Sequence, residues 1–110
     1  MTDTLAPAPR QTAASWLLQF VASGEIAPDI RSVSLVGDDL EGFDPSRGHY
    51  VILNLPTEGG ALRRPCTITA FDPLELRIDV GLPVAAGDPA ACWADGAQIG
   101  DAIAAELLTV

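Results

Sequence analysis

The sequence has few of the residues that build metal sites and disulfide frameworks. Its 110 residues include two cysteines and one histidine. Cys66 and Cys92 do not have the spacing of metal ligands, and a single pair of cysteines in a cytosolic protein is more often two buried thiols. The lone histidine, His49, lies in a predicted strand and is interpreted as structural. We therefore expect no metal site, and two thiols rather than a disulfide.

Basic residues and long apolar runs are also scarce. Six basic residues stand against fifteen acidic residues, for a net charge of -9. This charge repels nucleic acid and anionic membrane surfaces. No segment approaches the roughly 20 apolar residues that span a bilayer. The first ten residues, MTDTLAPAPR, also lack the basic and apolar regions of a signal peptide. We expect a cytoplasmic protein that binds neither nucleic acid nor membranes.

The length and composition are those of one globular domain. Hydrophobic residues make up 48% of the chain and charged residues 19%, which argues against extended disorder. Residues 1–10 are predicted to be a flexible leader, because Pro7 and Pro9 remove backbone donors and few apolar side chains are available for burial. Residues 11–110 are predicted to form a single domain.

An amphipathic helix is predicted over about residues 11–23. Thr12 is a suitable N-cap, and Gly24 is suited to the helix C-terminus. The apolar stripe of this helix consists of Trp16, Leu17, Phe20 and Val21. Such a stripe is expected to cover an apolar opening of the domain, or to form a homodimer by pairing with a second copy.

After Gly24 the apolar residues recur every second position, which is typical of strands. The segments with this pattern are DIRSVSLVG, HYVILNLP, CTITAF and LELRIDV, and the apolar segment AIAAELLTV follows at the end. Between the last two, Asp88 can cap a short helix that begins at Pro89 and ends at Gly96. These elements predict a mainly β fold: a small antiparallel barrel with an N-terminal amphipathic helix and one short helix.

Four segments in order carry a resemblance to a known family. They are EIAPDIRSVSLVGDDLEGF, GHYVILNLP, RRPCTITAFDP and ACWADGAQIGD. Together they resemble the flavin-binding barrel of the siderophore-interacting proteins, ferric-siderophore reductases related to the ferredoxin-reductase superfamily. The resemblance implies a Greek-key barrel like the FAD domain of ferredoxin reductases.

The resemblance also implies a flavin site with FAD as its cofactor. Arg64 matches the family's arginine, which contacts a flavin phosphate, and Thr67 matches a residue that hydrogen-bonds near the reactive ring nitrogen. Cys66 stands where the family has the tyrosine that packs on the isoalloxazine ring. The helix start would face the pyrophosphate. The implied cofactor-binding residues are Arg64, Cys66, Thr67, Ala90, Ala91 and Trp93.

The sequence departs from the family pattern at three places. Replacing tyrosine by Cys66 removes ring contact that contributes on the order of 1 kcal/mol. Asp88 stands beside the helix start, where a carboxylate competes with phosphate for the same backbone donors. Cys92 replaces a basic residue before the tryptophan. In addition, the family's nicotinamide-binding domain would begin beyond Val110, so we expect a separate protein to bind the nicotinamide cofactor.

Three functions remain open from the sequence, and no catalytic residue can be named. The first is a flavin-binding barrel that transfers electrons with a separate nicotinamide-binding partner. The alternative is a flavin-free barrel whose apolar cavity binds a small molecule, and which acts as a cyclase or isomerase in secondary metabolism by positioning its substrate. The third is a non-catalytic interaction protein that pairs through the Trp16 and Phe20 stripe.

Overall fold

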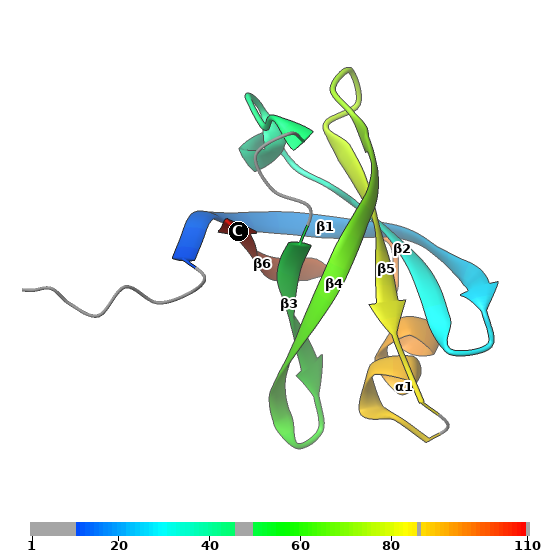
Figure 1. The fold of residues 1–110 in the computed structure, drawn as a ribbon. Coiled ribbons are helices and arrows are strands. Elements are labelled where there is room, and N and C mark those ends of the chain that lie inside the picture. Colours follow the sequence, from blue (N-terminus) through cyan, green and yellow to red (C-terminus); the bar gives the residue numbers. More distant parts are fainter. Residues whose placement is uncertain (1–10, 46–49, 86, 110) are drawn as a thin grey trace, which may run out of the picture.

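The computed structural model describes residues 11–45, 50–85 and 87–109. The predicted leader and His49 lie outside the described residues. The described elements, shown in Figure 1, are β1 (Gln11–Ala27), β2 (Ile30–Val36), the 3-10 helix η1 (Asp38–Leu40), β3 (Tyr50–Thr57), β4 (Gly60–Asp72), β5 (Arg77–Pro83), α1 (Pro89–Gly96) and β6 (Ala102–Thr109). In this part of the chain, no helix is long and apolar enough to cross a membrane.

The described strands form a closed barrel in the order β1-β2-β5-β4-β3-β6, and all neighbours are antiparallel. Strands β3, β4 and β5 follow one another directly, and β2 lies beside β5, which is a Greek-key arrangement. Closure gives every strand of this ring a neighbour on both sides. The prediction of a mainly β antiparallel barrel is confirmed, as is the short helix that begins at Pro89 and ends at Gly96.

The predicted helix over residues 11–23 is wrong, because this segment belongs to β1. Trp16 and Leu18 point into the core, whereas Leu17 between them is 63% exposed. The stretch WLLQF has apolar residues that satisfy both a helical and a two-residue period. Pairing with β2 and β6 selects the strand, since it buries alternate side chains inside a closed sheet.

This correction also removes the apolar stripe that was predicted to form a homodimer. Trp16 and Phe20 lie in the core with 6% and 4% exposure, while Leu17 points to the outside of the barrel. The predicted members of the stripe therefore do not share one exposed surface. Substitutions at Trp16 or Phe20 would therefore report on folding of the barrel and not on assembly.

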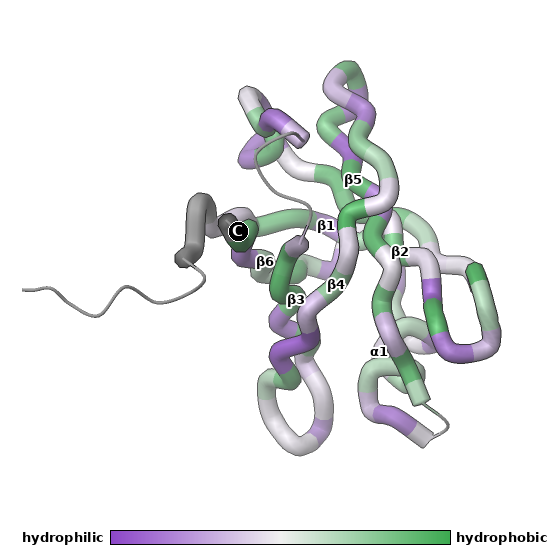
Figure 2. Tube along the Cα trace, viewed as in Figure 1, coloured by the Kyte–Doolittle hydropathy of each residue, from purple (hydrophilic) through white to green (hydrophobic). Residues whose placement is uncertain are grey.

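The interior of the barrel is filled by apolar side chains from its strands. Figure 2 shows how apolar and polar residues alternate along them. Fully buried residues include Leu18, Val33, Leu35, Val51, Leu53, Leu55, Ile78, Val80 and Leu82. Such packing is expected in a barrel of this small size. These apolar residues form one buried cluster, and the cleft considered below opens at the surface of the described chain.

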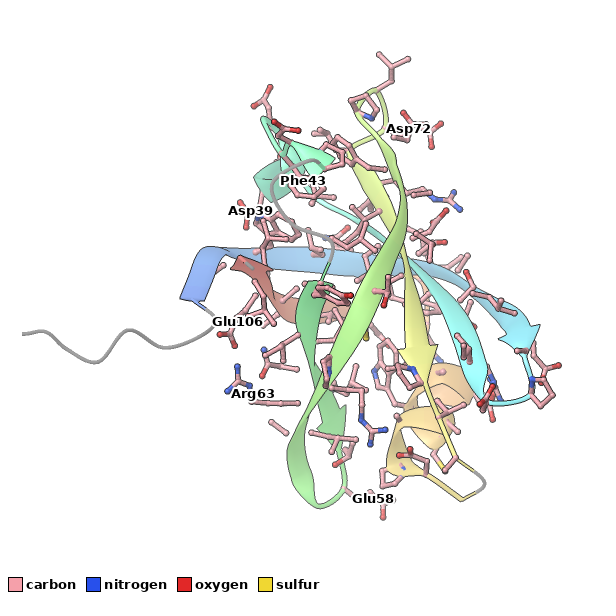
Figure 3. The ribbon with its side chains drawn as sticks, in the orientation of Figure 1. Asp39, Phe43, Glu58, Arg63, Asp72 and Glu106 are labelled. Carbon is pink, nitrogen blue, oxygen red and sulfur yellow. The ribbon has the colours of Figure 1, made fainter. Side chains whose placement is uncertain are left out.

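Aromatic contacts close the two ends of the barrel. Near η1, the ring of Phe43 packs edge-to-face on Trp16 at 5.1 Å and on Phe71 at 5.0 Å. Figure 3 shows Phe43 beside Asp39, whose carboxylate accepts a hydrogen bond from the Leu17 N–H at 2.8 Å. Helix α1 covers the opposite end, as seen in Figure 1. Both ends are therefore held by side chains distant in sequence.

Candidate functional site

Arg64 and Asp88 form a two-pronged ion pair between β4 and the start of α1. The Nη1 and Nη2 atoms of Arg64 donate to the two carboxylate oxygens of Asp88 at 2.9 and 3.1 Å. Nη1 also donates to the carbonyl oxygen of Pro83 at 3.3 Å. This fork-to-fork geometry is the strong form of an arginine–carboxylate contact. It engages the guanidinium that the resemblance assigned to a flavin phosphate.

The Asp88 carboxylate also caps the helix. It accepts hydrogen bonds from the backbone N–H of Ala90 at 2.9 Å and of Ala85 at 3.2 Å. The N–H of Ala90 and then the guanidinium of Arg64 hold the pKa of Asp88 below its ordinary value. The carboxylate is therefore charged at neutral pH, and its side chain is only 9% exposed.

The remaining donors in the first turn of α1 are also committed. Pro89 has no N–H. The N–H groups of Ala91 and Cys92 donate to the carbonyl oxygen of Asp88 at 2.9 and 3.2 Å. Across the described residues 89–92, every backbone donor at the helix start thus already has Asp88 as its partner. The free N–H groups that make a helix start attractive to phosphate are satisfied from within the chain.

Cys66 and Thr67 lie on opposite faces of β4. Cys66 points into the core and is 2% exposed, whereas Thr67 is exposed on the outer face. Thr67 pairs with Tyr50 of β3, which is 47% exposed and therefore lies on the same outer face. Tyr50 is thus a further candidate that the sequence did not single out, although its place on the mixed face of HYVILNLP was a signal. The structure does not bring the implied ring-binding residues together.

The two thiols differ sharply in environment. Cys92 is exposed, so the expectation of two buried thiols is wrong for this residue. Burial raises the pKa of the Cys66 thiol to about 12, against a smaller lowering by the nearby Arg64 charge. Only a thiolate reacts rapidly with disulfide reagents. Cys66 is therefore expected to be inert in the folded protein.

We predict that the native protein releases one equivalent of thionitrobenzoate from Ellman's reagent within minutes, and the second only after denaturation. The physical reason is that Cys66 can neither ionise nor reach the reagent while the barrel is closed. The visible absorbance of the released thionitrobenzoate measures the number of thiols that have reacted. A Cys92→Ser variant should show no rapid phase, and rapid reaction in that variant would contradict the buried position of Cys66.

Trp93 and Ala90 attach α1 to the barrel. The Trp93 ring packs edge-to-face on Phe20 at 5.8 Å, and Ala90 is fully buried. At the far end of the helix, Arg31 of β2 pairs with Asp95 at 2.6 Å. Two of the residues assigned to cofactor binding thus have a clear structural role. Their positions keep the start of α1 next to Arg64.

A surface cleft of about 540 Å³ lies between α1 and the tip of the β3–β4 hairpin. The hairpin contributes Pro56, Thr57, Glu58 and Gly59, and the helix side contributes Gly87, Pro89, Cys92 and Trp93. Figure 3 labels Glu58 at the hairpin tip. Gly87 and Pro89 flank Asp88, so the ion pair adjoins this cleft. Its volume is within the range of small-molecule sites.

The structure unites some of the implied site residues and separates others. Arg64, Ala90 and Ala91 converge on Asp88, and Trp93 lines the cleft. Sequence reasoning missed the hairpin wall, because nothing local indicates that residues 56–59 face a helix thirty positions later. In the described residues, no group of three or more His, Cys, Asp or Glu side chains is arranged to hold a metal ion.

The pyrophosphate of FAD does not fit this donor set. A diphosphate needs uncommitted cations and N–H groups. Here Arg64 and the first turn of α1 are both satisfied by Asp88. The position that would stack on the flavin ring, Cys66, is inside the core. The outer face around Thr67 and Tyr50 still offers an exposed hydroxyl and an aromatic ring to a flavin.

Known structures share this fold. A siderophore utilization protein from T. fusca has a TM-score of 0.68 and 23% identity, over 88% of this chain and 47% of that protein. The siderophore-interacting protein SipS from Aeromonas hydrophila has a TM-score of 0.67 and 23% identity, over 84% of this chain and 42% of that protein. Phthalate dioxygenase reductase is described as a modular structure for electron transfer from pyridine nucleotides to a 2Fe-2S centre. It has a TM-score of 0.60 and 19% identity, over 86% of this chain and 29% of that protein.

These alignments concern the barrel alone. The chain spans less than half the length of each of the three proteins. Its sequence matches no protein-family model and is similar to no curated protein. At these identities the likeness establishes the fold and not the ligand. The protein therefore has the barrel fold found in siderophore-interacting proteins, which confirms the resemblance at the level of fold.

Proposed function

We propose that this chain is a small-molecule-binding barrel whose ligand carries no phosphate group and lies in the cleft between α1 and the β3–β4 hairpin. One observation carries the proposal. Asp88 occupies both Arg64 and the start of α1, the two elements of this surface that could receive a phosphate. The cleft beside this ion pair keeps a volume suited to a small molecule.

The charge and lining of the cleft support a neutral ligand. The chain carries a net charge of -9, and Glu58 adds a carboxylate to the cleft wall. Both disfavour anions. Pro56, Pro89 and Trp93 offer apolar contact, and the Thr57 hydroxyl, which donates to the Gly60 carbonyl oxygen, can accept a hydrogen bond. A cleft of this kind can hold a flexible substrate in a reactive conformation, which is the route to the cyclase or isomerase activity considered above.

A second candidate is the flavin-binding half of a two-protein electron-transfer system. The fold shared with the reductase supports it. So does the pairing of Thr67 with the exposed Tyr50 ring, which provides a hydroxyl and an aromatic surface on one face. When bound, a flavin would supply electron transfer, and Thr67 would orient its ring. This candidate requires either that the flavin phosphates lie away from Arg64 or that the Asp88 carboxylate moves away from the Arg64 guanidinium.

Riboflavin, FMN and FAD separate the two candidates, because they share the isoalloxazine ring. FMN adds one phosphate to riboflavin, and FAD adds a diphosphate and adenosine. We predict that the protein binds FAD no more tightly than riboflavin, since the added phosphates find no free donor and meet a negative surface. Quenching of flavin fluorescence during titration with the protein measures the affinities. FAD binding at least about tenfold tighter than riboflavin would favour the second candidate, since that ratio matches one charge-assisted hydrogen bond.

Cys92 provides a direct reporter for the cleft, because its exposed thiol belongs to the lining. A neutral compound seated there should slow the reaction of Cys92 with iodoacetamide, and mass spectrometry after timed quenching measures that rate. A panel of neutral cyclic and polyene compounds is a suitable set of probes. If no compound in the panel protects Cys92 while FAD does, the phosphate-free proposal is wrong.

A further inference from the structure

We propose that Asp88 is an internal substitute for a ligand phosphate, and that its carboxylate excludes phosphate-bearing molecules from the cleft beside α1. The inference rests on the proposed function for its statement about the cleft. The experiment that tests it does not depend on the proposed function, because it measures the binding of an anion at Arg64 and needs no ligand in the cleft.

The contacts of Asp88 are those expected of a bound oxyanion. Its two oxygens accept two hydrogen bonds from the Arg64 guanidinium and one each from the N–H groups of Ala90 and Ala85. A carboxylate has about four acceptor positions, so its capacity is used. A guanidinium fork, a helix N-terminus and a loop N–H form the set of donors that phosphate groups also use.

Tethering makes the carboxylate a strong competitor. Asp88 is joined to α1 directly through Pro89, so its effective concentration at Arg64 is millimolar or higher, on the order of that for a short linker. A free anion at micromolar concentration cannot displace it without leaving its charge unpaired in a place where the side chain is only 9% exposed. Among the residues that line or adjoin the cleft, Arg64 is the cation, and its ion pair with Asp88 keeps it from binding an anion.

A purely structural reading of Asp88 makes a different prediction. As a helix cap alone, Asp88 is replaceable by serine or asparagine, which serve equally well as N-caps. Asp88→Ser would then free the Arg64 guanidinium only as Asp95→Ser frees that of Arg31, and the two variants would bind an anion equally. If instead the carboxylate occupies an anion site, serine keeps a capping oxygen but is too short to reach the guanidinium, and Arg64 becomes available.

The test is isothermal titration of inorganic pyrophosphate into the wild type, Asp88→Ser and Asp95→Ser at constant ionic strength. Asp95 is the matched control, because it caps no helix start but pairs with an arginine, Arg31, at the other end of α1. Both variants change the net charge equally. We expect Asp88→Ser to bind pyrophosphate at least about tenfold more tightly than Asp95→Ser, as one charge-assisted hydrogen bond provides. Adding Arg64→Gln to Asp88→Ser should abolish the gain.

Two results would overturn the inference. One is equal affinity of Asp88→Ser and Asp95→Ser for pyrophosphate. The other is tight binding by the wild type that Arg64→Gln removes, since the anion would then displace Asp88 freely. If circular dichroism shows that Asp88→Ser does not fold, Asp88→Asn takes its place, because asparagine retains the capping oxygen without the charge. Its affinity for pyrophosphate is then compared with that of Asp95→Ser. A pyrophosphate gain with no protection of Cys92 by any neutral compound would keep this inference and remove the proposed function.

Discussion

Replacing Trp16 with alanine is expected to lower the free energy of unfolding by about 3–5 kcal/mol, the usual cost of deleting a large buried aromatic side chain. Trp16 is 6% exposed and packs edge-to-face on Phe43. Its neighbour Leu17 is 63% exposed on the outside of β1. Leu17→Ala should therefore change the free energy of unfolding by no more than about 0.5 kcal/mol.

Urea denaturation followed by far-UV circular dichroism measures both variants without depending on tryptophan fluorescence. A domain of this size has a total stability of about 5–15 kcal/mol, so the loss in Trp16→Ala is easily resolved. The pair of variants also tests the strand at this position. On the helix predicted from the sequence, Trp16 and Leu17 share one apolar stripe, and similar losses in the two variants would contradict the alternation found in β1.

Placing a tyrosine at position 66 is expected to damage the barrel and not to create a flavin site. Cys66 is 2% exposed and faces the packed interior. A phenol ring there would need space that the neighbouring side chains fill, and overpacking of a core typically costs about 1–3 kcal/mol or more. Because the added volume is large, we expect Cys66→Tyr to lose about 3 kcal/mol.

Thr67→Tyr is the matched control, since it adds a tyrosine one residue away on the exposed outer face. It should leave the free energy of unfolding within about 0.5 kcal/mol of the wild type. Thermal and urea denaturation give the stabilities, and FAD titration followed by absorbance gives the ligand response. A Cys66→Tyr variant that keeps wild-type stability and turns yellow with FAD would show that residue 66 faces a ligand site.

The same barrel can carry different ligands because the residues that fill its interior are not those that contact a ligand. The core of this chain supports the fold shared with the siderophore-interacting proteins. On the surface between β4 and α1, a tethered carboxylate satisfies the donors on which a phosphate would depend. The proposed function thus depends on Asp88 and its partners, and not on the residues that form the barrel.

The sequence by itself determined the elements whose signals are local. The alternation in HYVILNLP and LELRIDV predicts strands because each places one apolar face inward. Strand β3 confirms the first, and β5 confirms the second from Arg77 onward, whereas residues 73–76 form a turn. The Asp88–Pro89 pair predicts the start of α1 because capping depends on adjacent residues. The order of four family-like segments was sufficient to predict the barrel.

Tertiary structure alone decided the rest. WLLQF is compatible with two periods, and only its pairing with β2 and β6 makes it a strand. Whether Cys66 or Thr67 faces inward depends on the register of β4 against its neighbours, since a shift of one residue exchanges the faces. Arg64 and Asp88 are distant in sequence and meet because the antiparallel pairing of β4 with β5 brings Arg64 beside Pro83, from which the chain continues to α1. Contacts of this kind arise from the packing of whole strands, and no local pattern encodes them.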